Sequence, residues 1–195
     1  MAAEHAELPV AARVRQLEER VIAAGLASDA ELDAVLAGLY AGASPVNGAS
    51  MVARAWADPG YRERLLADGN EAAAELGFGP SAGHGYRLRV VANTPAVHNL
   101  VVCTLCSCYP VALLGPSPSW YKSLAYRSRA VREPRSVLAE FGLQVPVGTD
   151  VAVWDASAET RYLVLPLRPA GTEGLGEDEL ASRVTQRGLI GTAAV

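Results

Sequence analysis

The sequence contains no apolar run approaching the roughly 18 residues that a membrane-spanning helix needs. It also has no cluster of lysines and arginines, and its formal net charge is −4. Neither a membrane nor a nucleic acid is therefore an expected partner. The first residues are polar and acidic, without the basic and then apolar regions of a secretory signal. A cytoplasmic location is predicted.

Cysteine is scarce as well, but its few copies are crowded together. All 3 cysteines of the 195 residues lie in one stretch, with the spacing C-x-x-C-x-C at Cys103, Cys106 and Cys108. In a reducing compartment, such cysteines are metal ligands or redox groups more often than a structural disulfide. A redox dithiol leaves the third cysteine unexplained. A zinc knuckle with His98 as fourth ligand lacks the usual second C-x-x-C. Inert buried cysteines are the remaining alternative.

The spacing of the cysteines favours one particular kind of metal site. If the sulfurs of Cys106 and Cys108 bind one ion, the backbone nitrogens of Ser107 and Cys108 face that ion too. These four donors form a near-planar set, which Cys103 can cap from one side, leaving one open position. Such strong donors favour iron(III) or cobalt(III) over zinc. The open position suits a Lewis acid that activates a substrate or water, and thiolates there can oxidise to sulfenic and sulfinic acids.

Apolar periodicity, capping residues and turn residues predict helices followed by a small sheet with further helices. The expected helices span about residues 9–25, 28–41, 51–56, 59–66, 71–76, 120–131, 134–141 and 177–186, with a linker at 42–48. The expected strands span about residues 86–92, 100–102, 151–154 and 162–165.

These elements predict an α+β fold with two parts. Residues 1–45 are expected to form an N-terminal helical arm, and residues 46–195 a small layered α-β-β-α domain that binds metal and carries catalysis. Each of the first two helices has one apolar stripe. This stripe can pack on the chain's own domain or be covered by a partner chain.

The stretch Val102–Pro110, Val-Cys-Thr-Leu-Cys-Ser-Cys-Tyr-Pro, resembles the metal-binding loop of nitrile hydratase α subunits. The resemblance covers about residues 10–195. The other matching segments are Asn93–Asn99, Trp120–Ser123, Tyr126–Arg135, Val153–Glu159, Arg161–Pro166 and Arg168–Gly174.

This resemblance implies hydration of a small-molecule nitrile to an amide at a non-haem iron or non-corrin cobalt centre. The implied ligands are the sulfurs of Cys103, Cys106 and Cys108 and the backbone nitrogens of Ser107 and Cys108, with Cys106 as sulfinic and Cys108 as sulfenic acid. Thr104 is similar to the cobalt subgroup, so Co(III) is predicted, with Fe(III) as the alternative. Tyr109, a further neighbour of the metal, carries the same subgroup resemblance.

The resemblance also implies partners and further roles. A β-type subunit would contribute arginines to the oxidised sulfurs, and a metallochaperone or activator would load the metal. Ser107 would orient the ligand in the open position, and the nucleophile would be either the Cys108 sulfenate or hydroxide at the metal. Asp155 and Glu159 match acidic residues near the family's site, although both also fit ordinary solvated loop carboxylates.

Two positions depart from the family's pattern. Val111 and Ala112 stand where Trp-Pro is common, which predicts a wider pocket and a bulky nitrile, such as one on a purine-like nucleoside. His84 stands where a glutamine is common and would contact substrate or partner, unless it is simply exposed in its glycine-rich loop. Two alternatives remain: the metal-bearing subunit of a thiocyanate hydrolase, and a metal-binding or redox module without catalysis of its own.

Overall fold

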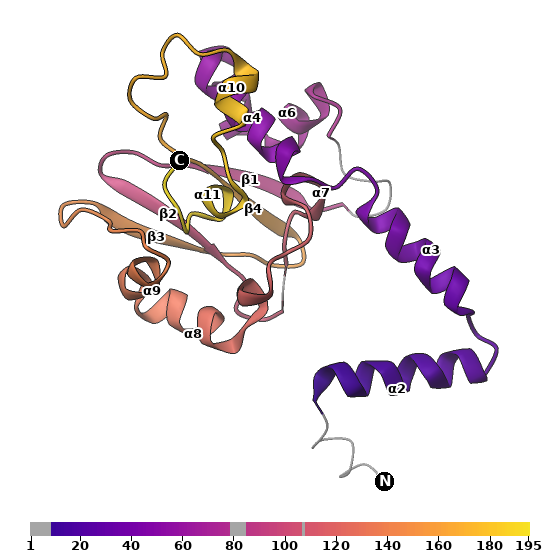
Figure 1. The fold of residues 1–195 in the computed structure, drawn as a ribbon. Coiled ribbons are helices and arrows are strands. Elements are labelled where there is room, and N and C mark those ends of the chain that lie inside the picture. The colour runs from indigo at the N-terminus through magenta and orange to yellow at the C-terminus, as the bar shows by residue number, and fades with distance from the viewer. Residues whose placement is uncertain (1–8, 79–84, 107) are drawn as a thin grey trace. The chain divides into compact units, whose positions relative to one another are not determined.

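The computed structural model describes residues 9–78, 85–106 and 108–195 of the chain (Figure 1). The chain divides into two compact units, Met1–Ala41 and Gly42–Val195. In the described part of the chain, no helix is long and apolar enough to cross a membrane.

The first unit contains two of the predicted helices, α2 (Val10–Ala23) and α3 (Asp29–Tyr40). The capping box predicted at Ser28 is confirmed: its hydroxyl accepts from the Glu31 amide at 3.3 Å, and its amide donates to the Glu31 carboxylate at 2.8 Å. No residue of α2 is buried, and apolar side chains stay exposed on both helices and between them. These exposed side chains are Val10, Val14, Leu17, Leu26, Val35, Leu36 and Tyr40.

The predicted linker at residues 42–48 is wrong in its second half, because α4 (Pro45–Ala57) already begins there. The Ser44 hydroxyl caps this helix by accepting from the Val46 amide, and Pro45 takes the first position, where no amide hydrogen is needed. The small residues that suggested a linker serve close packing instead. A Cβ at Gly48 would lie 2.8 Å from the Leu113 carbonyl oxygen, so only glycine fits.

Two short helices follow, and each has an aspartate at its N-cap. The predicted cap at Asp58 is confirmed, because its carboxylate accepts from the amides of Gly60 and Tyr61 at the start of α5 (Pro59–Ala67). Asp68 caps α6 (Gly69–Glu75), which therefore begins two residues earlier than the predicted residue 71.

The four strands found in residues 9–78, 85–106 and 108–195 form two parallel pairs. Strand β1 (Arg87–Ala92) pairs with β4 (Thr160–Leu165), and β2 (Val97–Val102) pairs with β3 (Asp150–Asp155). The register places Val102 opposite Asp155. The last residue of β2, which leads into the cysteine loop, therefore lies beside the carboxylate that ends β3.

The remaining helices are short, and two predicted helices are each divided. The elements are α7 (Val111–Leu114), the 3₁₀ turn η1 (Ser119–Lys122), α8 (Leu124–Arg132), α9 (Pro134–Glu140), α10 (Glu177–Ala181) and α11 (Gln186–Ile190). The predicted helix at 120–131 breaks at Ser123, whose hydroxyl caps α8. The predicted helix at 177–186 ends early because Thr185 caps a separate helix, α11, by accepting from the Gly188 amide.

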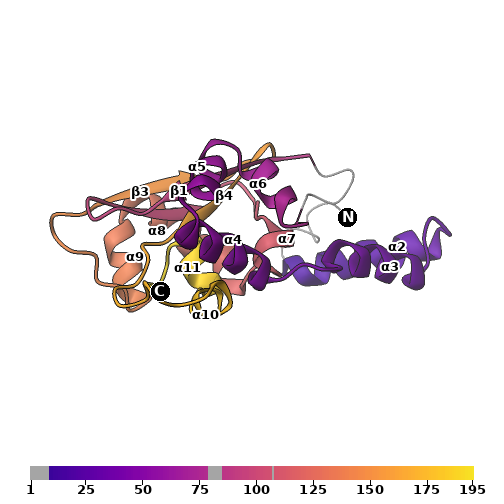
Figure 2. The same ribbon diagram turned by 90° about the horizontal axis from the view of Figure 1, so that it is seen from above.

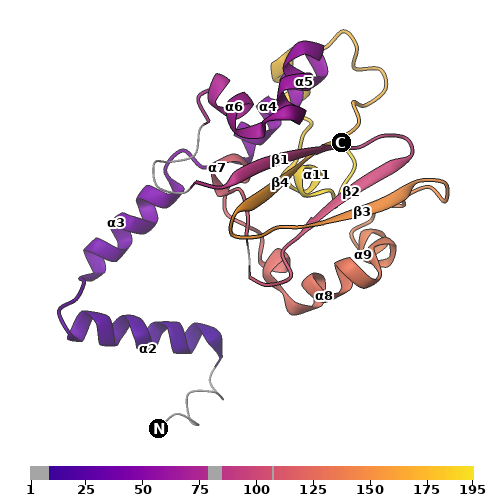
Figure 3. The same cartoon turned by 180° about the vertical axis from the view of Figure 1, so that it is seen from behind.

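Within the second unit, helices cover both sides of the strands. Helices α5 and α6 pack against β1, while α8 contacts β2 and α9 contacts β3, as Figures 1 and 3 show from opposite sides. Helices α4 and α11 lie side by side (Figure 2). This layering of helices around short strands confirms the α+β prediction.

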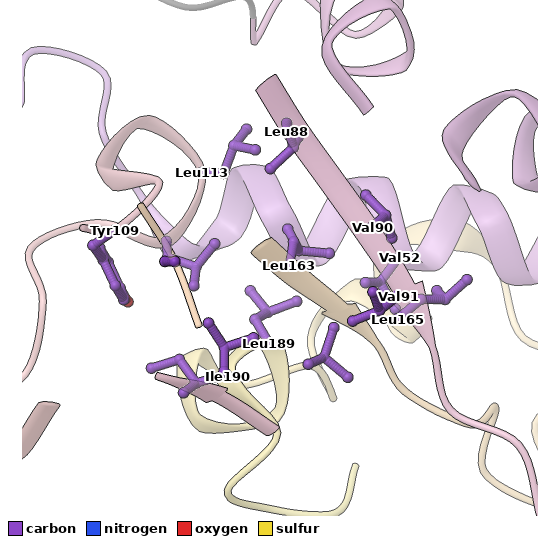
Figure 4. Packing of buried hydrophobic residues seen from close by; sticks show 14 of the residues in the cluster. Val52, Leu88, Val90, Val91, Tyr109, Leu113, Leu163, Leu165, Leu189 and Ile190 are labelled. Atoms are coloured by element: carbon purple, nitrogen blue, oxygen red, sulfur yellow. The ribbon is translucent and has the colours of Figure 1, made fainter. Parts of the chain in front are cut away.

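The core of this unit joins the strands to α4, α7 and α11. Side chains such as Val52, Leu113, Leu163 and Leu189 gather in one apolar interior, and Tyr109 lies at its edge (Figure 4). Burial of this apolar surface is the main stabilising contribution, at about 25 cal/mol per Å². The frame that carries the cysteine loop is therefore a packed core.

One buried amide ties both strand pairs together. Asn99 on β2 donates to the Ala92 carbonyl at the end of β1 at 2.9 Å, and its side-chain oxygen accepts from the Trp154 indole on β3 at 2.8 Å. The backbone N–H of Asn99 donates to the side-chain oxygen of Asn93. Because a buried amide without partners is costly, this satisfied network specifies how the strands meet.

Candidate metal centre

The three cysteines occupy the loop between β2 and α7. Cys103 directly follows β2 and is buried, Cys106 is exposed, and Cys108 is buried again near the start of α7. The turn brings their sulfurs together, with the Sγ atoms of Cys103 and Cys106 3.5 Å apart and those of Cys106 and Cys108 3.0 Å apart. All three Sγ atoms lie within 4.8 Å of one another. Among the described residues, this is the group of side chains that can hold a metal ion.

The sulfur positions fit a single ion better than a disulfide. Both of these sulfur–sulfur separations, 3.5 and 3.0 Å, exceed the covalent sulfur–sulfur length of about 2.05 Å. Two sulfurs bound to one ion through bonds of about 2.3 Å lie at most about 4.6 Å apart. Three converging sulfurs, two of them shielded from water by the protein, therefore make a donor set that suits one thiophilic ion.

One backbone hydrogen bond is directed at the sulfur cluster, because the Cys106 amide donates to the Cys103 sulfur at 3.3 Å. Burial of Cys108, together with its hydrogen bond to Cys106, raises the pKa of the Cys108 thiol to about 12, against the opposing effect of the Arg161 charge. A metal ion bound here would displace this proton.

Two charged residues hold the first turn of the loop. Asp155 accepts from the Thr104 amide at 2.8 Å and from the Thr104 hydroxyl at 2.5 Å. Arg127 on α8 donates through Nε to the Cys103 carbonyl at 3.1 Å and through Nη2 to the Thr104 carbonyl at 2.5 Å. The turn between Cys103 and Cys106 is thus held from two different elements.

Buried tyrosines hold the two ends of the loop. Tyr126 donates to the Val101 carbonyl at 2.6 Å, ahead of the loop, and Tyr121 donates to the Cys108 carbonyl at 3.0 Å. Tyr109 packs edge-to-face against Tyr121, with ring centroids 5.1 Å apart. Burial raises the pKa of each of these phenols well above the usual value, so all three hydroxyls stay protonated at physiological pH, and those of Tyr121 and Tyr126 remain donors.

The other residues singled out from the sequence are placed as follows. Val111 is half-buried at the first position of α7 and packs against the core. Glu159 is exposed in the turn before β4, where its carboxylate accepts from the Ser157 hydroxyl at 2.9 Å, which lowers its pKa. His84 and Ser107 lie outside the described residues.

The alternative of His98 as a zinc ligand is wrong. Its Nε2 lies 2.7 Å from the Gly191 carbonyl oxygen, which can only accept, so Nε2 carries the proton. Its Nδ1 then accepts from the Asn93 side-chain amide at 3.3 Å. Both ring nitrogens are therefore used within the fold, away from the sulfur cluster.

Sequence reasoning missed Arg127, Tyr121 and Tyr126 as residues that hold the loop. All three lie in segments that carry the family resemblance, but no local pattern indicates their contacts. Their contacts arise only because α8 packs beside β2 and η1 packs against α8. The fold and the three-sulfur cluster together define a candidate mononuclear metal centre on an α+β scaffold.

Comparison with known proteins gives the same class. The family model "Nitrile hydratase, alpha chain" matches residues 8–193. The low-molecular-weight cobalt-containing nitrile hydratase subunit alpha of Rhodococcus rhodochrous is 48% identical over 184 residues, covering 94% of this chain and 88% of that one. The cobalt-containing subunit alpha of Pseudonocardia thermophila is 47% identical over 190 residues, covering 96% and 92%. The chain belongs to the nitrile hydratase α-chain family.

Solved structures agree with this assignment. A double mutant of the Fe-type nitrile hydratase from Comamonas testosteroni Ni1 superposes with a TM-score of 0.85 at 42% identity, covering 96% of this chain and 92% of that one. A thiocyanate hydrolase with partially modified cobalt centres reaches a TM-score of 0.82 at 43% identity, covering 96% and 90%. The subunit gamma of the Thiobacillus thioparus thiocyanate hydrolase is 48% identical over 159 residues, covering 76% of this chain and 65% of that one.

Proposed function

We propose that this chain is the α subunit of a nitrile hydratase, which works with a β-type subunit to add water to a nitrile and release the amide. The observation that carries the proposal is the convergence of three cysteine sulfurs within 4.8 Å in a loop held at both ends, in a chain of this family. A partner subunit is supported by the "subunit alpha" relatives and by the exposure of Cys106. Loading by a metallochaperone or activator and a cytoplasmic location remain predictions.

The proposed metal is Co(III), with Fe(III) as the alternative. Cobalt is supported by the cobalt-containing relatives at 43–48% identity and by the residue types at Thr104 and Tyr109. The Fe-type structural neighbour keeps iron open. The ligands would be the sulfurs of Cys103, Cys106 and Cys108, with backbone nitrogens of Ser107 and Cys108. When bound, the ion supplies Lewis acidity at one open position.

The chain's own residues supply the frame for this chemistry. Asp155 and Arg127 hold the Thr104 turn, and the two tyrosines hold the loop ends, so the sulfurs converge without large rearrangement. We assign catalysis to Cys108, whose sulfur is screened from bulk water, and substrate orientation to Ser107. Glu159 is assigned a supporting role in the turn beside Asp155.

The proposed substrate is a bulky nitrile, such as one carried by a purine-like nucleoside. Support comes from Val111, which stands where the family commonly has tryptophan and which is only half-buried. Replacement of an indole by an isopropyl group frees volume near the loop. A Val111→Trp variant should therefore lose activity on a bulky aromatic nitrile while retaining most of its activity on acetonitrile. Equal losses on both substrates would contradict the wide pocket.

The thiocyanate hydrolase alternative has support from similar identity, although that relative matches over a shorter part of both chains. One experiment tests both functions. The chain is co-expressed with its β-type partner in cobalt medium, and amide formation and thiocyanate consumption are measured on the same complex. Amide formation that tracks cobalt content supports the proposal. Turnover of thiocyanate alone favours the alternative, and zinc or no metal in a complex without either activity refutes both.

A matched pair of variants tests the metal centre. Cys108→Ser removes one buried sulfur ligand, so the complex should bind little cobalt and lose at least 100-fold in activity. Ser182→Ala is the control and should change neither quantity, because it removes an exposed hydroxyl at the C-cap of α10 that donates to the Glu179 carbonyl. Full activity in Cys108→Ser would exclude this cluster as the catalytic centre.

A further inference from the structure

The peptide unit between Cys103 and Thr104 is held at both of its polar ends. Its carbonyl oxygen, on Cys103, accepts from Arg127 Nε at 3.1 Å, and its amide hydrogen, on Thr104, is donated to Asp155 Oδ1 at 2.8 Å. A flip of this peptide plane would break both bonds at once. The orientation of the chain just after the first sulfur ligand is therefore set by two charged side chains.

The same two side chains bind the other polar groups of Thr104. Its hydroxyl donates to Asp155 Oδ2 at 2.5 Å, and its carbonyl accepts from Arg127 Nη2 at 2.5 Å. Every polar group of Thr104 thus has a charged partner. Hydrogen bonds to charged groups are shorter and stronger than neutral ones. We call Arg127 and Asp155 together the Thr104 clamp.

The Thr104 clamp is anchored in two elements of the fold. Asp155 ends β3 in register with Val102, and Arg127 lies on α8 beside Tyr126, whose hydroxyl is bonded to the strand ahead of the loop. In the described part of the chain, neither Arg127 nor Asp155 takes part in an ion pair. Their charges are thus directed at the loop backbone.

We propose that Arg127 is a positioning residue for metal loading, which together with Asp155 orders the Cys103–Thr104 turn so that the three sulfurs converge before the ion arrives. A loop that is already ordered loses less conformational freedom on binding, so its affinity is higher. The inference rests on the proposed function only in taking the cysteine cluster as the metal centre.

The test uses the full chain, reduced and without oxygen, titrated with Co(II) against a chelator of known affinity. Arg127→Gln removes the charge and the two-pronged donor. Arg127→Lys keeps the charge but offers a single point donor. The matched control is Arg132→Gln on the same helix, because Arg132 is exposed and donates only to the Ser128 hydroxyl, at 3.4 Å. Circular dichroism and thermal unfolding of each apo variant report whether the fold is kept.

The Kd for Co(II) is expected to rise about tenfold in Arg127→Gln, which corresponds to about 1.4 kcal/mol of binding free energy. The Kd should rise less in Arg127→Lys. It should stay within twofold of the wild-type value in Arg132→Gln. Asp155→Asn, which loses the acceptor for the Thr104 hydroxyl, should also weaken binding. An unchanged Kd in a folded Arg127→Gln chain would overturn the proposal. If Arg127→Gln does not fold, an unchanged Kd in both Arg127→Lys and Asp155→Asn would overturn it.

A second readout separates this inference from the proposed enzyme activity. In the complex with the partner subunit, nitrile hydration by Arg127→Lys should fall in proportion to its cobalt content, with activity per cobalt atom kept within twofold. Full cobalt content with low activity per cobalt would contradict a loading role. If the wild-type complex hydrates no nitrile but the Co(II) affinities differ as expected, the proposed function fails while the Thr104 clamp stands.

Discussion

Replacement of Gly191 by alanine should be among the most damaging single substitutions in the second unit. Gly191 ends α11 with a φ of +90°, a conformation that disfavours any side chain. Its backbone also lies against β2, because an added Cβ would be 2.0 Å from the Asn99 carbonyl oxygen. Strand β2 leads directly to Cys103, so the damage should extend to the metal centre.

The structure supports an estimate of the loss. The positive φ alone costs about 1–2 kcal/mol for alanine. Relief of the overlap with Asn99 requires movement of packed backbone, which adds about 1–3 kcal/mol. This movement also disturbs the bond from His98 Nε2 to the Gly191 carbonyl, worth about 0.5–1.5 kcal/mol. The free energy of unfolding should therefore fall by about 2.5–6.5 kcal/mol in total.

Gly142 provides a matched control. It follows α9 with a φ of +84°, and an added Cβ would meet no atom within 4 Å. Gly142→Ala should therefore cost only the backbone term of about 1–2 kcal/mol. Urea unfolding at constant pH measures both variants, and the difference isolates the close approach to Asn99. Equal losses in the two variants would refute the reasoning, because the contact with β2 would then contribute nothing.

The remaining predictions concern single polar contacts of the frame. Tyr126→Phe leaves the Val101 carbonyl without its buried donor and should lower the free energy of unfolding by about 1–3 kcal/mol in urea titration; an unchanged midpoint would show that this bond is dispensable. Burial lowers the pKa of His98 below its usual value of about 6.5. Because the unfolded chain then takes up this proton first, the contribution of His98 to the free energy of unfolding should be constant above about pH 6.5. Below that pH it should fall by at most about 1.4 kcal/mol per pH unit. His98→Gln should remove this part of the slope, and an identical pH profile in the variant would exclude His98 as its source.

The starts of two helices followed from the sequence because a side chain caps its own backbone there. Ser28 and Asp58 were recognisable as caps because their partners lie two or three residues away. The boundary at Pro45 was misjudged because Gly48 is also a typical linker residue. Its packing role depends on Leu113, 65 residues further along the chain. Local chemistry is thus visible in the sequence, whereas close packing between distant segments is not.

Pairing of the strands was beyond what the sequence indicates. Each strand was recognisable from its apolar residues, but parallel partners such as Val102 and Asp155 are separated by 53 positions and share no turn that would fix their register. The same holds for the support of the loop. Asp155 was noted through its resemblance to family residues, but its bond to Thr104 follows from the register of β2 and β3.

The sequence by itself determined the chemistry of the site, because the spacing of Cys103, Cys106 and Cys108 places three sulfurs in one short turn whatever the rest of the chain does. It also determined the family, through segments spread over most of the chain. Only the tertiary structure decided what holds that turn, since Arg127 and Asp155 reach Thr104 from a helix and a strand that are distant in sequence. The physical reason is that ligand spacing is a local property of the chain, whereas preorganisation arises from contacts between elements that fold together.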